Sequence, residues 1–317
     1  LYAARATPAQ EIAFSFAIAK EYIDALLERG LEIDEVAPYF SFVTGIDMDF
    51  FESIAKMRTY RKGWARLLSE HYGAKRTESL RQRMTGSPGT MPLTLQQPLN
   101  NIARLGIMMM ANALGTSGQQ MNTPLFDEAH ALPSDDAVQV GSAVQHIVAH
   151  ETGVADTVDP LAGSYYLETL TKQLETAVLE ELERIDEIGG ALEAIKGGYF
   201  QRKLAEEQWE RNKQIETGDR KIVGINHLTR EEDNAQIPLF KLDDETEKIQ
   251  VERLREYKAG RDPARVADAL ERIREAARGS ENLVPVCLEA VRVQATHGEM
   301  CDAMRDVYGE YRPEGTF

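Results

Sequence analysis

The chain has few cysteines, no long apolar segment and no excess of positive charge. Its two cysteines, Cys287 and Cys301, fall in one late segment with helical periodicity, so we expect reduced thiols rather than a disulfide framework. No run approaches the ~18 apolar residues that a membrane-spanning helix needs. Because 52 acidic residues outweigh 36 basic ones, for a net charge of −16, a general nucleic-acid surface is also excluded. We therefore expect neither a membrane nor a nucleic acid as partner.

Several common catalytic motifs are missing as well. The chain has no Gly-x-Ser-x-Gly elbow, no dinucleotide-binding fingerprint, no P-loop and no His-Glu-x-x-His pair. His146 and His150 lie four residues apart on a predicted helix, but no third ligand accompanies them, so we predict no metal site. The lack of a nucleophile and base set fits an enzyme in which a cofactor supplies the reactivity.

Strand and helix patterns alternate through the first half of the chain. Thr7-Pro8-Ala9-Gln10 predicts a capped helix start. Further helices are predicted at about 49–68, 98–114 and 135–150 and from 163, and strands at about 40–46, 79–85, 119–123 and 155–158. Four strand–helix units at roughly 35 to 40 residues each predict the second half of a (β/α)8 TIM-type barrel in the α/β class. An open doubly wound sheet is the structural alternative.

After about residue 175 the strand patterns stop. Charged amphipathic helices follow, interrupted at Gly189, Gly197 and Gly218. We therefore predict two domains, a half-barrel over residues 1–175 and an all-helical C-terminal extension over residues 176–317.

Polar residues near the carboxyl ends of the predicted strands are the first candidates for chemistry. That end of a parallel barrel normally holds the active site. The candidates are Ser41, Thr44, Arg83, Thr85, Gln119, Asn122, Asp156 and Asp159. The plainer interpretation is that they cap the helices that follow.

Two segments carry a resemblance to a known family. They are residues 118–133, GQQMNTPLFDEAHALP, and residues 155–166, ADTVDPLAGSYY. Both resemble the large subunit of the adenosylcobalamin-dependent acyl-CoA mutases, the methylmalonyl-CoA mutase family. Matches at 6–14, 50–58, 93–101 and 298–304 keep the same order along the chain. The resemblance therefore covers essentially the whole sequence.

The resemblance implies a barrel threaded by an acyl-CoA substrate and capped by a cobalamin-binding domain or small subunit. It implies a radical 1,2-rearrangement of the carbon skeleton that depends on adenosylcobalamin, in a hetero- or homodimer. The implied location is the cytoplasm, or the mitochondrial matrix in a eukaryote. The chain is then expected to be the C-terminal part of the barrel plus a linker, beginning inside a longer protein at Leu1.

Individual residues carry over from the family only where they match its motifs. Gln119 matches a glutamine that lies in the active site near the substrate, and Glu128 matches an acidic residue that binds the adenosyl ribose. Ser41 matches a serine that contacts the CoA arm, and Arg76 is a looser match for a basic residue there. Thr85 is expected to contact CoA as well.

Other positions depart from the family. Arg83-Met84-Thr85-Gly86-Ser87 replaces the strand motif His-x-Gln-Thr-Ser-Gly, and Tyr39 stands where an arginine usually contacts CoA. Because the changes cluster in the expected pocket, they favour an altered acyl-CoA substrate. Arg83 is then a candidate catalytic residue that meets a substrate carboxylate or the CoA phosphates. The alternative is a non-catalytic assembly or interaction homologue of the large subunit.

Overall fold

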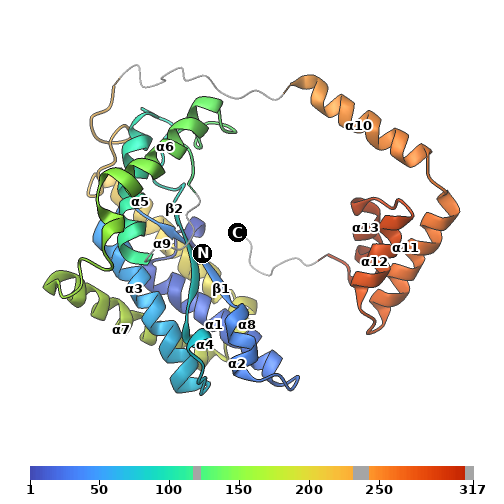
Figure 1. The fold of residues 1–317 in the computed structure, drawn as a ribbon, viewed down its shortest axis with the longest axis horizontal. Coiled ribbons are helices and arrows are strands. Elements are labelled where there is room, and N and C mark those ends of the chain that lie inside the picture. The colour runs from blue at the N-terminus through green and yellow to red at the C-terminus, as the bar shows by residue number, and fades with distance from the viewer. Residues whose placement is uncertain (117–122, 231–242, 311–317) are drawn as a thin grey trace. The chain divides into compact units, whose positions relative to one another are not determined.

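A computed structural model describes residues 1–116, 123–230 and 243–310 of the chain. The chain divides into two compact units, residues 1–240 and residues 241–316 (Figure 1). Each is described by itself below.

The first unit begins with helices and two strands in alternation. Helix α1 starts at Thr7, whose hydroxyl accepts a hydrogen bond from the Gln10 amide while the Gln10 side chain accepts one from the Thr7 amide, as the sequence predicts. The elements of this part are α1 (Pro8–Leu27), α2 (Ile33–Val36), β1 (Ser41–Ile46), α3 (Phe50–Arg66), η3 (Leu67–His71), α4 (Thr77–Leu80), β2 (Arg83–Pro88) and α5 (Asn100–Thr116). Helices α1, α3 and α5 confirm three of the predicted helices.

Strands β1 and β2 form a small parallel sheet. The register pairs Ser41 with Arg83 at one end and Ile46 with Pro88 at the other. Phe42 and Met84 are buried on one face, which α1, α3 and α5 cover. There the ring of Phe42 packs against an aromatic group from α1 and α3, formed by Phe16, Tyr60 and Trp64.

The predicted half-barrel is seen only in part, because the described residues contain two strands in the sheet. The strand predicted at 79–85 begins at Arg83, since Thr77–Leu80 forms the short helix α4. The strand predicted at 155–158 is wrong: a 3-10 turn, η4 (Val154–Asp156), follows Gly153 in the left-handed conformation. The strand predicted at 119–123 lies almost entirely outside the described residues. The described architecture is a mostly helical α/β unit with a small parallel sheet.

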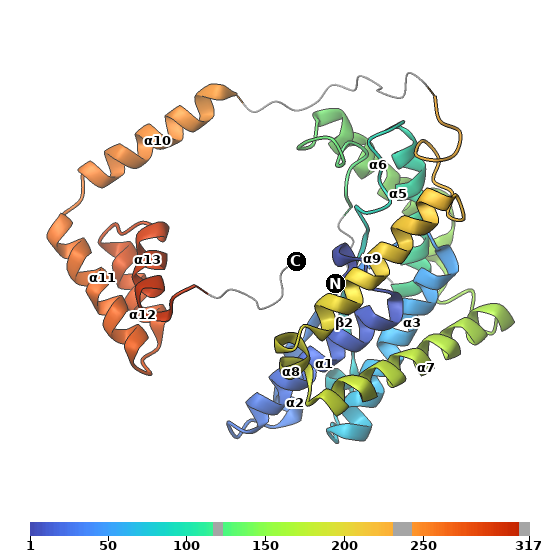
Figure 2. The same cartoon turned by 180° about the vertical axis from the view of Figure 1, so that it is seen from behind.

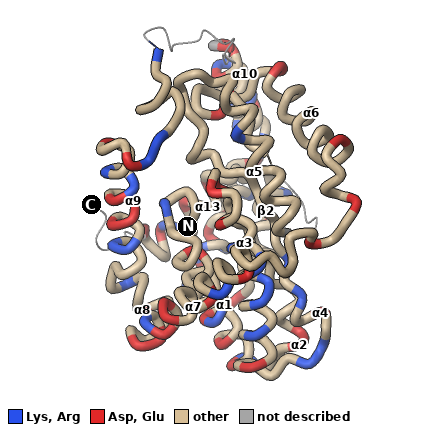
Figure 3. The backbone as a smooth tube through the Cα atoms, turned by 90° about the vertical axis from the view of Figure 1, so that its left-hand side faces the viewer, with Lys and Arg blue, Asp and Glu red and all other residues tan. Residues whose placement is uncertain are grey.

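The rest of the first unit is helical. It contains α6 (Asp135–Glu151), α7 (Tyr165–Ile188), α8 (Ala191–Lys196) and α9 (Tyr199–Thr217). Helix α7 packs on α1 and α3, and α8 packs on α1 (Figure 2). The ring of Phe200 in α9 stacks on that of Phe14 in α1, with centroids 3.9 Å apart. Helices α8 and α9 carry charges of both signs, whereas α5 carries few (Figure 3). The domain division at 175 and 176 stays a prediction.

The described residues of the second unit are mostly helical. Its helices are α10 (Asp244–Ala259), α11 (Pro263–Arg278), α12 (Leu283–Arg292) and α13 (His297–Tyr308). Val266, Ile273 and Ala303 belong to its separate apolar core. Arg261 donates two hydrogen bonds to Glu299, at 2.7 and 2.5 Å, which together with the Thr296 amide holds the pKa of that carboxyl well below its usual range. Among the described residues of the whole chain, every helix is too short or too polar to cross a membrane.

Candidate functional site

The second face of the β1–β2 sheet is open. Ser41 and Val43 of β1 and Arg83 and Thr85 of β2 alternate with the buried residues and so share this face, which we call the open face. Val43 is 77% exposed although it is a β-branched apolar residue at the centre of a strand. Within the described residues, Val43 therefore presents its apolar side chain to the open face without a packed layer over it.

Three of the predicted CoA-contacting or catalytic residues therefore lie together. Ser41 and Arg83 are direct register partners, and Thr85 follows on the same face of β2. The structure thus brings residues from two separate sequence motifs onto one surface.

Arg76 joins this group at the amino ends of the strands. Arg76 and Arg83 line one open pocket together with Tyr39, whose ring is largely exposed. The Asp34 carboxylate accepts hydrogen bonds from the backbone amides of Lys75 and Arg76, each at 3.2 Å, and so holds the loop that carries Arg76. Within the described part of the chain, neither guanidinium makes an ion pair.

The position of these residues corrects one expectation. Ser41 and Arg83 are the first residues of their strands, so they lie at the amino ends of the sheet and not at the carboxyl ends. Strand β1 begins within one residue of its predicted start, so Ser41 lies near the amino end of the predicted strand as well. Strand β2 begins four residues later than predicted, which moves Arg83 from the carboxyl end of the strand to its amino end. The candidate site therefore includes the amino ends of β1 and β2, where Arg76 and Arg83 lie.

Thr44, another of the predicted candidates, has a structural role. It is buried, and its hydroxyl donates to Oε1 of Glu11 at 2.7 Å. Lys56 Nζ lies 2.8 Å from Oε2 of Glu11 and also donates to the carbonyl of Gly45. The two charged side chains are 4% and 3% exposed. This buried ion pair joins α1, α3 and β1 beneath the sheet.

Sequence reasoning missed the Glu11–Lys56 pair. A signal was present, because Lys56 interrupts the apolar run Ile54-Ala55-Lys56-Met57 on the buried side of its helix. A charge inside an apolar stripe needs a buried partner. Only the fold shows that the partner is Glu11, 45 residues earlier.

Tyr2 closes the open face at the carboxyl ends of the strands. A Cβ at Gly45 would come 2.2 Å from its ring and one at Gly89 would come 1.8 Å from its hydroxyl, so a side chain at either position would displace the Tyr2 ring. Burial, reinforced by the nearby Asp47 carboxylate, raises the pKa of the Tyr2 phenol above its usual value. The phenol is therefore neutral at pH 7. Sequence reasoning did not single out Tyr2.

Glu128 lies apart from the sheet, on a turn between α5 and α6. Its side chain is exposed, while the neighbouring Asp127 is fully buried and accepts hydrogen bonds from the amide and hydroxyl of Ser134 at 2.9 and 2.8 Å. Asn101 donates to the carbonyl of Phe126 at 2.9 Å. Buried polar groups thus fix the turn, and the exposed Glu128 carboxylate makes no ion pair with the residues that the structure describes.

The remaining candidates are scattered. Gln119 and Asn122 lie outside the described residues, and Asp156 ends the turn η4. Asp159 forms an ion pair with Arg58 at 3.0 Å, which gives it a structural role. His146 and His150 stack with ring centroids 5.6 Å apart, and the described part of the chain holds no cluster of three or more metal-ligating side chains.

Comparison with protein families shows which family the chain belongs to. The family model described as methylmalonyl-CoA mutase matches residues 1–310. The chain belongs to the methylmalonyl-CoA mutase family. The motif resemblance seen in the sequence is thereby confirmed, and the family implies that the β1–β2 unit is a portion of a TIM barrel.

Individual relatives in the family are similar over almost the whole chain. The large subunit of 2-hydroxyisobutanoyl-CoA mutase from Aquincola tertiaricarbonis is 34% identical over 99% of this chain and 56% of its own length. Methylmalonyl-CoA mutase from Rhizobium meliloti is 37% identical over 97% of this chain and 43% of its own length. Human mitochondrial methylmalonyl-CoA mutase is 35% identical over 95% of this chain and 40% of its own length. The chain spans about half the length of these family members.

Proposed function

We propose that this chain is part of the catalytic large subunit of an adenosylcobalamin-dependent acyl-CoA mutase, an isomerase that rearranges the carbon skeleton of an acyl-CoA by a radical 1,2-shift. The observation that carries the proposal is the family match across residues 1–310. The relatives' names include two different acyl groups, so the family alone leaves the acyl group open.

The open face of the sheet supports a role in binding the CoA arm. Ser41 and Thr85 place hydroxyl groups along it, and Arg76 and Arg83 add two cations at its amino end. A guanidinium binds phosphate oxygens through paired N–H donors, and among the described residues neither Arg76 nor Arg83 forms an ion pair. The carboxylates of Asp34 and Glu35 line the same pocket, so we propose that CoA phosphates contact the two guanidinium groups on the side away from these carboxylates. For Arg83, this position favours a contact with the phosphates over one with the acyl carboxylate.

Gln119 is proposed to lie near the acyl group, as the family motif implies. Tyr2 adds a neutral phenol at the carboxyl ends of β1 and β2, where a barrel normally places its chemistry. The two ends of the open face would then serve different parts of one substrate.

Glu128 fits the role of a cofactor contact. Its exposed carboxylate on a fixed turn offers acceptors for two adjacent hydroxyl groups, the donors that a ribose presents. When bound, adenosylcobalamin supplies hydrogen abstraction through homolysis of its cobalt–carbon bond. The chain's own contribution would be to position substrate and ribose and to exclude water.

The proposed partner is a cobalamin-binding domain or small subunit, in a hetero- or homodimer. A relative named as a large subunit supports this arrangement. The proposed location is the cytoplasm, or the mitochondrial matrix in a eukaryotic cell.

The test is an isomerase assay on the complete protein with its cobalamin-binding partner. We expect turnover of at least one acyl-CoA from a panel of branched and dicarboxylic thioesters, including methylmalonyl-CoA and 2-hydroxyisobutanoyl-CoA, only when adenosylcobalamin is added. A paramagnetic signal that depends on substrate should accompany turnover. Absence of both across the panel would favour the non-catalytic alternative, which the changes at Tyr39 and Arg83 motivate.

The role of Glu128 is tested without turnover. Glu128→Gln should weaken adenosylcobalamin binding about tenfold, measured by absorbance titration, because one charge-assisted hydrogen bond is lost. Affinity for acyl-CoA should stay the same. Equal cofactor affinity in wild type and variant would remove Glu128 from the site.

A further inference from the structure

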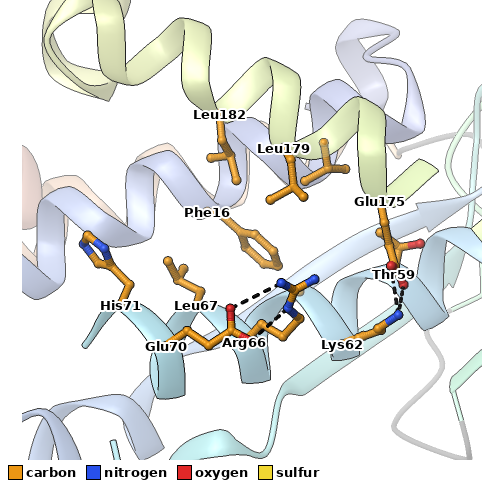
Figure 4. Close-up of a pocket in the computed structure, with 12 residues that line it drawn as sticks. Phe16, Thr59, Lys62, Arg66, Leu67, Glu70, His71, Glu175, Leu179 and Leu182 are labelled. Atoms are coloured by element: carbon orange, nitrogen blue, oxygen red, sulfur yellow. Dashed lines mark hydrogen bonds and ion pairs between the residues drawn. The ribbon is translucent and has the colours of Figure 1, made fainter. Parts of the chain in front are cut away.

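A second, separate pocket lies among the helices of the first unit, away from the open face. It is formed between α3 with its extension η3 on one side and α7 on the other, and Phe16 of α1 forms its floor (Figure 4). Leu179 and Leu182 point from α7 toward Phe16, and Leu67 approaches from η3. The cavity volume is about 150 Å³.

The lining of this helix pocket is almost wholly apolar. Of its polar groups, Thr59 is buried and donates to the carbonyl of Thr171, His71 is exposed, and the four charged side chains are paired. Lys62 lies 2.7 Å from the Glu175 carboxylate, and Arg66 lies 3.1 Å from that of Glu70 (Figure 4). A charged ligand would have to lose water without gaining a free counter-charge, whereas a neutral apolar one gains from leaving water.

The wall of the pocket contains an irregular helical turn. Residues Leu67–His71 form a π-helical turn, closed by a hydrogen bond of 3.3 Å from the Tyr72 amide to the Leu67 carbonyl. Leu67, Glu70 and His71 from this turn all line the pocket. π-helical turns are rare in proteins, and this one ends α3 and does not interrupt it. This observation is independent of the pocket's shape.

Phe16 and strand β1 lie between this pocket and the proposed CoA site. The ring of Phe16 meets that of Phe42 in β1 edge to face, with centroids 6.0 Å apart. Phe42 lies on the covered side of the sheet, and its neighbours Ser41 and Val43 lie on the open face. The two sites are thus on opposite sides of β1.

From these observations we propose that the pocket between α3, η3 and α7 binds a small neutral apolar molecule, either an aromatic ring or a branched aliphatic group. An apolar cavity of ~150 Å³ in another protein stays dry and binds benzene, which sets the size of the ligand. The pocket does not depend on the mutase assignment, because no residue in it belongs to the proposed CoA or cofactor contacts.

The experiment uses benzene as probe, with benzoate as its charged analogue, and the complete protein in its complex. Calorimetry should show saturable benzene binding with a dissociation constant on the order of a millimolar or below. Benzoate should bind at least about tenfold more weakly, because the two cations that line the pocket, Lys62 and Arg66, are already paired with carboxylates.

Variants then locate the binding. Leu179 is 55% exposed, so Leu179→Trp should fill the pocket from its rim without unfolding the protein, and Leu179→Phe is a milder second variant. Both should abolish benzene binding. Leu192→Trp, at a leucine 52% exposed on α8, is the matched control and should leave it unchanged. Absence of saturable binding to the wild type would overturn the proposal. Unchanged binding in folded Leu179 variants would do the same.

Discussion

The two faces of the β1–β2 sheet differ in what covers them, although they come from the same twelve residues. The covered face packs Phe42 and Met84 against three helices. The open face carries Ser41, Val43, Arg83 and Thr85 with no such cover among the described residues. Neighbouring residues in one strand therefore have side chains in different environments, one against the helices and the next on the open face. Packing against helices accounts for the apolar residues of the covered face. For the residues of the open face, we propose contact with a ligand or with further strands of a barrel.

The largest expected effect lies beneath the covered face. Lys56→Met leaves the buried Glu11 carboxylate without its counter-charge and should destabilise the protein by about 3–5 kcal/mol. Denaturant unfolding of the complete protein measures the change. Lys62→Met is the matched control, because that lysine is 57% exposed, and it should cost about 1 kcal/mol or less. Equal effects of both changes would contradict the structural role of the Glu11–Lys56 pair.

Two adjacent residues of β1 test the comparison directly. Phe42 is 9% exposed and Val43 is 77% exposed. Phe42→Ala should cost about 3–5 kcal/mol of unfolding free energy, because it leaves a cavity among packed aromatic rings. Val43→Ala should stay within about 0.5 kcal/mol unless the remainder of the protein covers it. A large loss for Val43→Ala would show that the open face is itself a packed core in the complete protein.

A third change addresses the open face alone. Arg83→Ala should weaken acyl-CoA binding about 10- to 100-fold, because a charge-assisted contact is lost, and leave stability nearly unchanged. Equilibrium dialysis with labelled acyl-CoA measures the affinity. Arg83→Lys should recover part of it, and Arg278→Ala, in α11 of the second unit, should have no effect. Unchanged turnover and affinity in Arg83→Ala would remove this residue from the site.

The smallest effect is expected at Thr85. Thr85→Val keeps the shape and strand preference of the side chain but removes its hydroxyl, so acyl-CoA affinity should fall about 2- to 10-fold. Thr176→Val on α7 is the control and should leave binding unchanged. If Thr85→Val lowered stability and left affinity intact, Thr85 would belong with the covered residues.

Local signals account for what the sequence predicts well. The capping box at Thr7 and the apolar periodicity that follows specify α1, and similar patterns specify α3, α5, α6 and α7. These signals act within one or two turns of chain. Strand β1 is also predicted, because its β-rich run lies between two strong helices.

Strands that depend on distant partners are predicted less well. The run Ala155-Asp156-Thr157-Val158 resembles a strand, yet Gly153 and the positive φ of Asp159 turn the backbone on either side of it. Sequence motifs identify Ser41 and Arg83 as candidates. Their pairing across the sheet follows from a register set by contacts between segments 42 residues apart, which a single sequence does not reveal.

The central claim is that acyl-CoA lies along the open face of β1 and β2. The direct measurement is the alkylation rate of a thiol at Val43→Cys in the complete protein, followed by mass spectrometry with and without saturating acyl-CoA. Val138→Cys, at an exposed position on α6, is the reference. The account predicts that acyl-CoA slows alkylation at position 43 at least about tenfold and leaves position 138 unchanged. Equal rates at position 43 with and without ligand would contradict it.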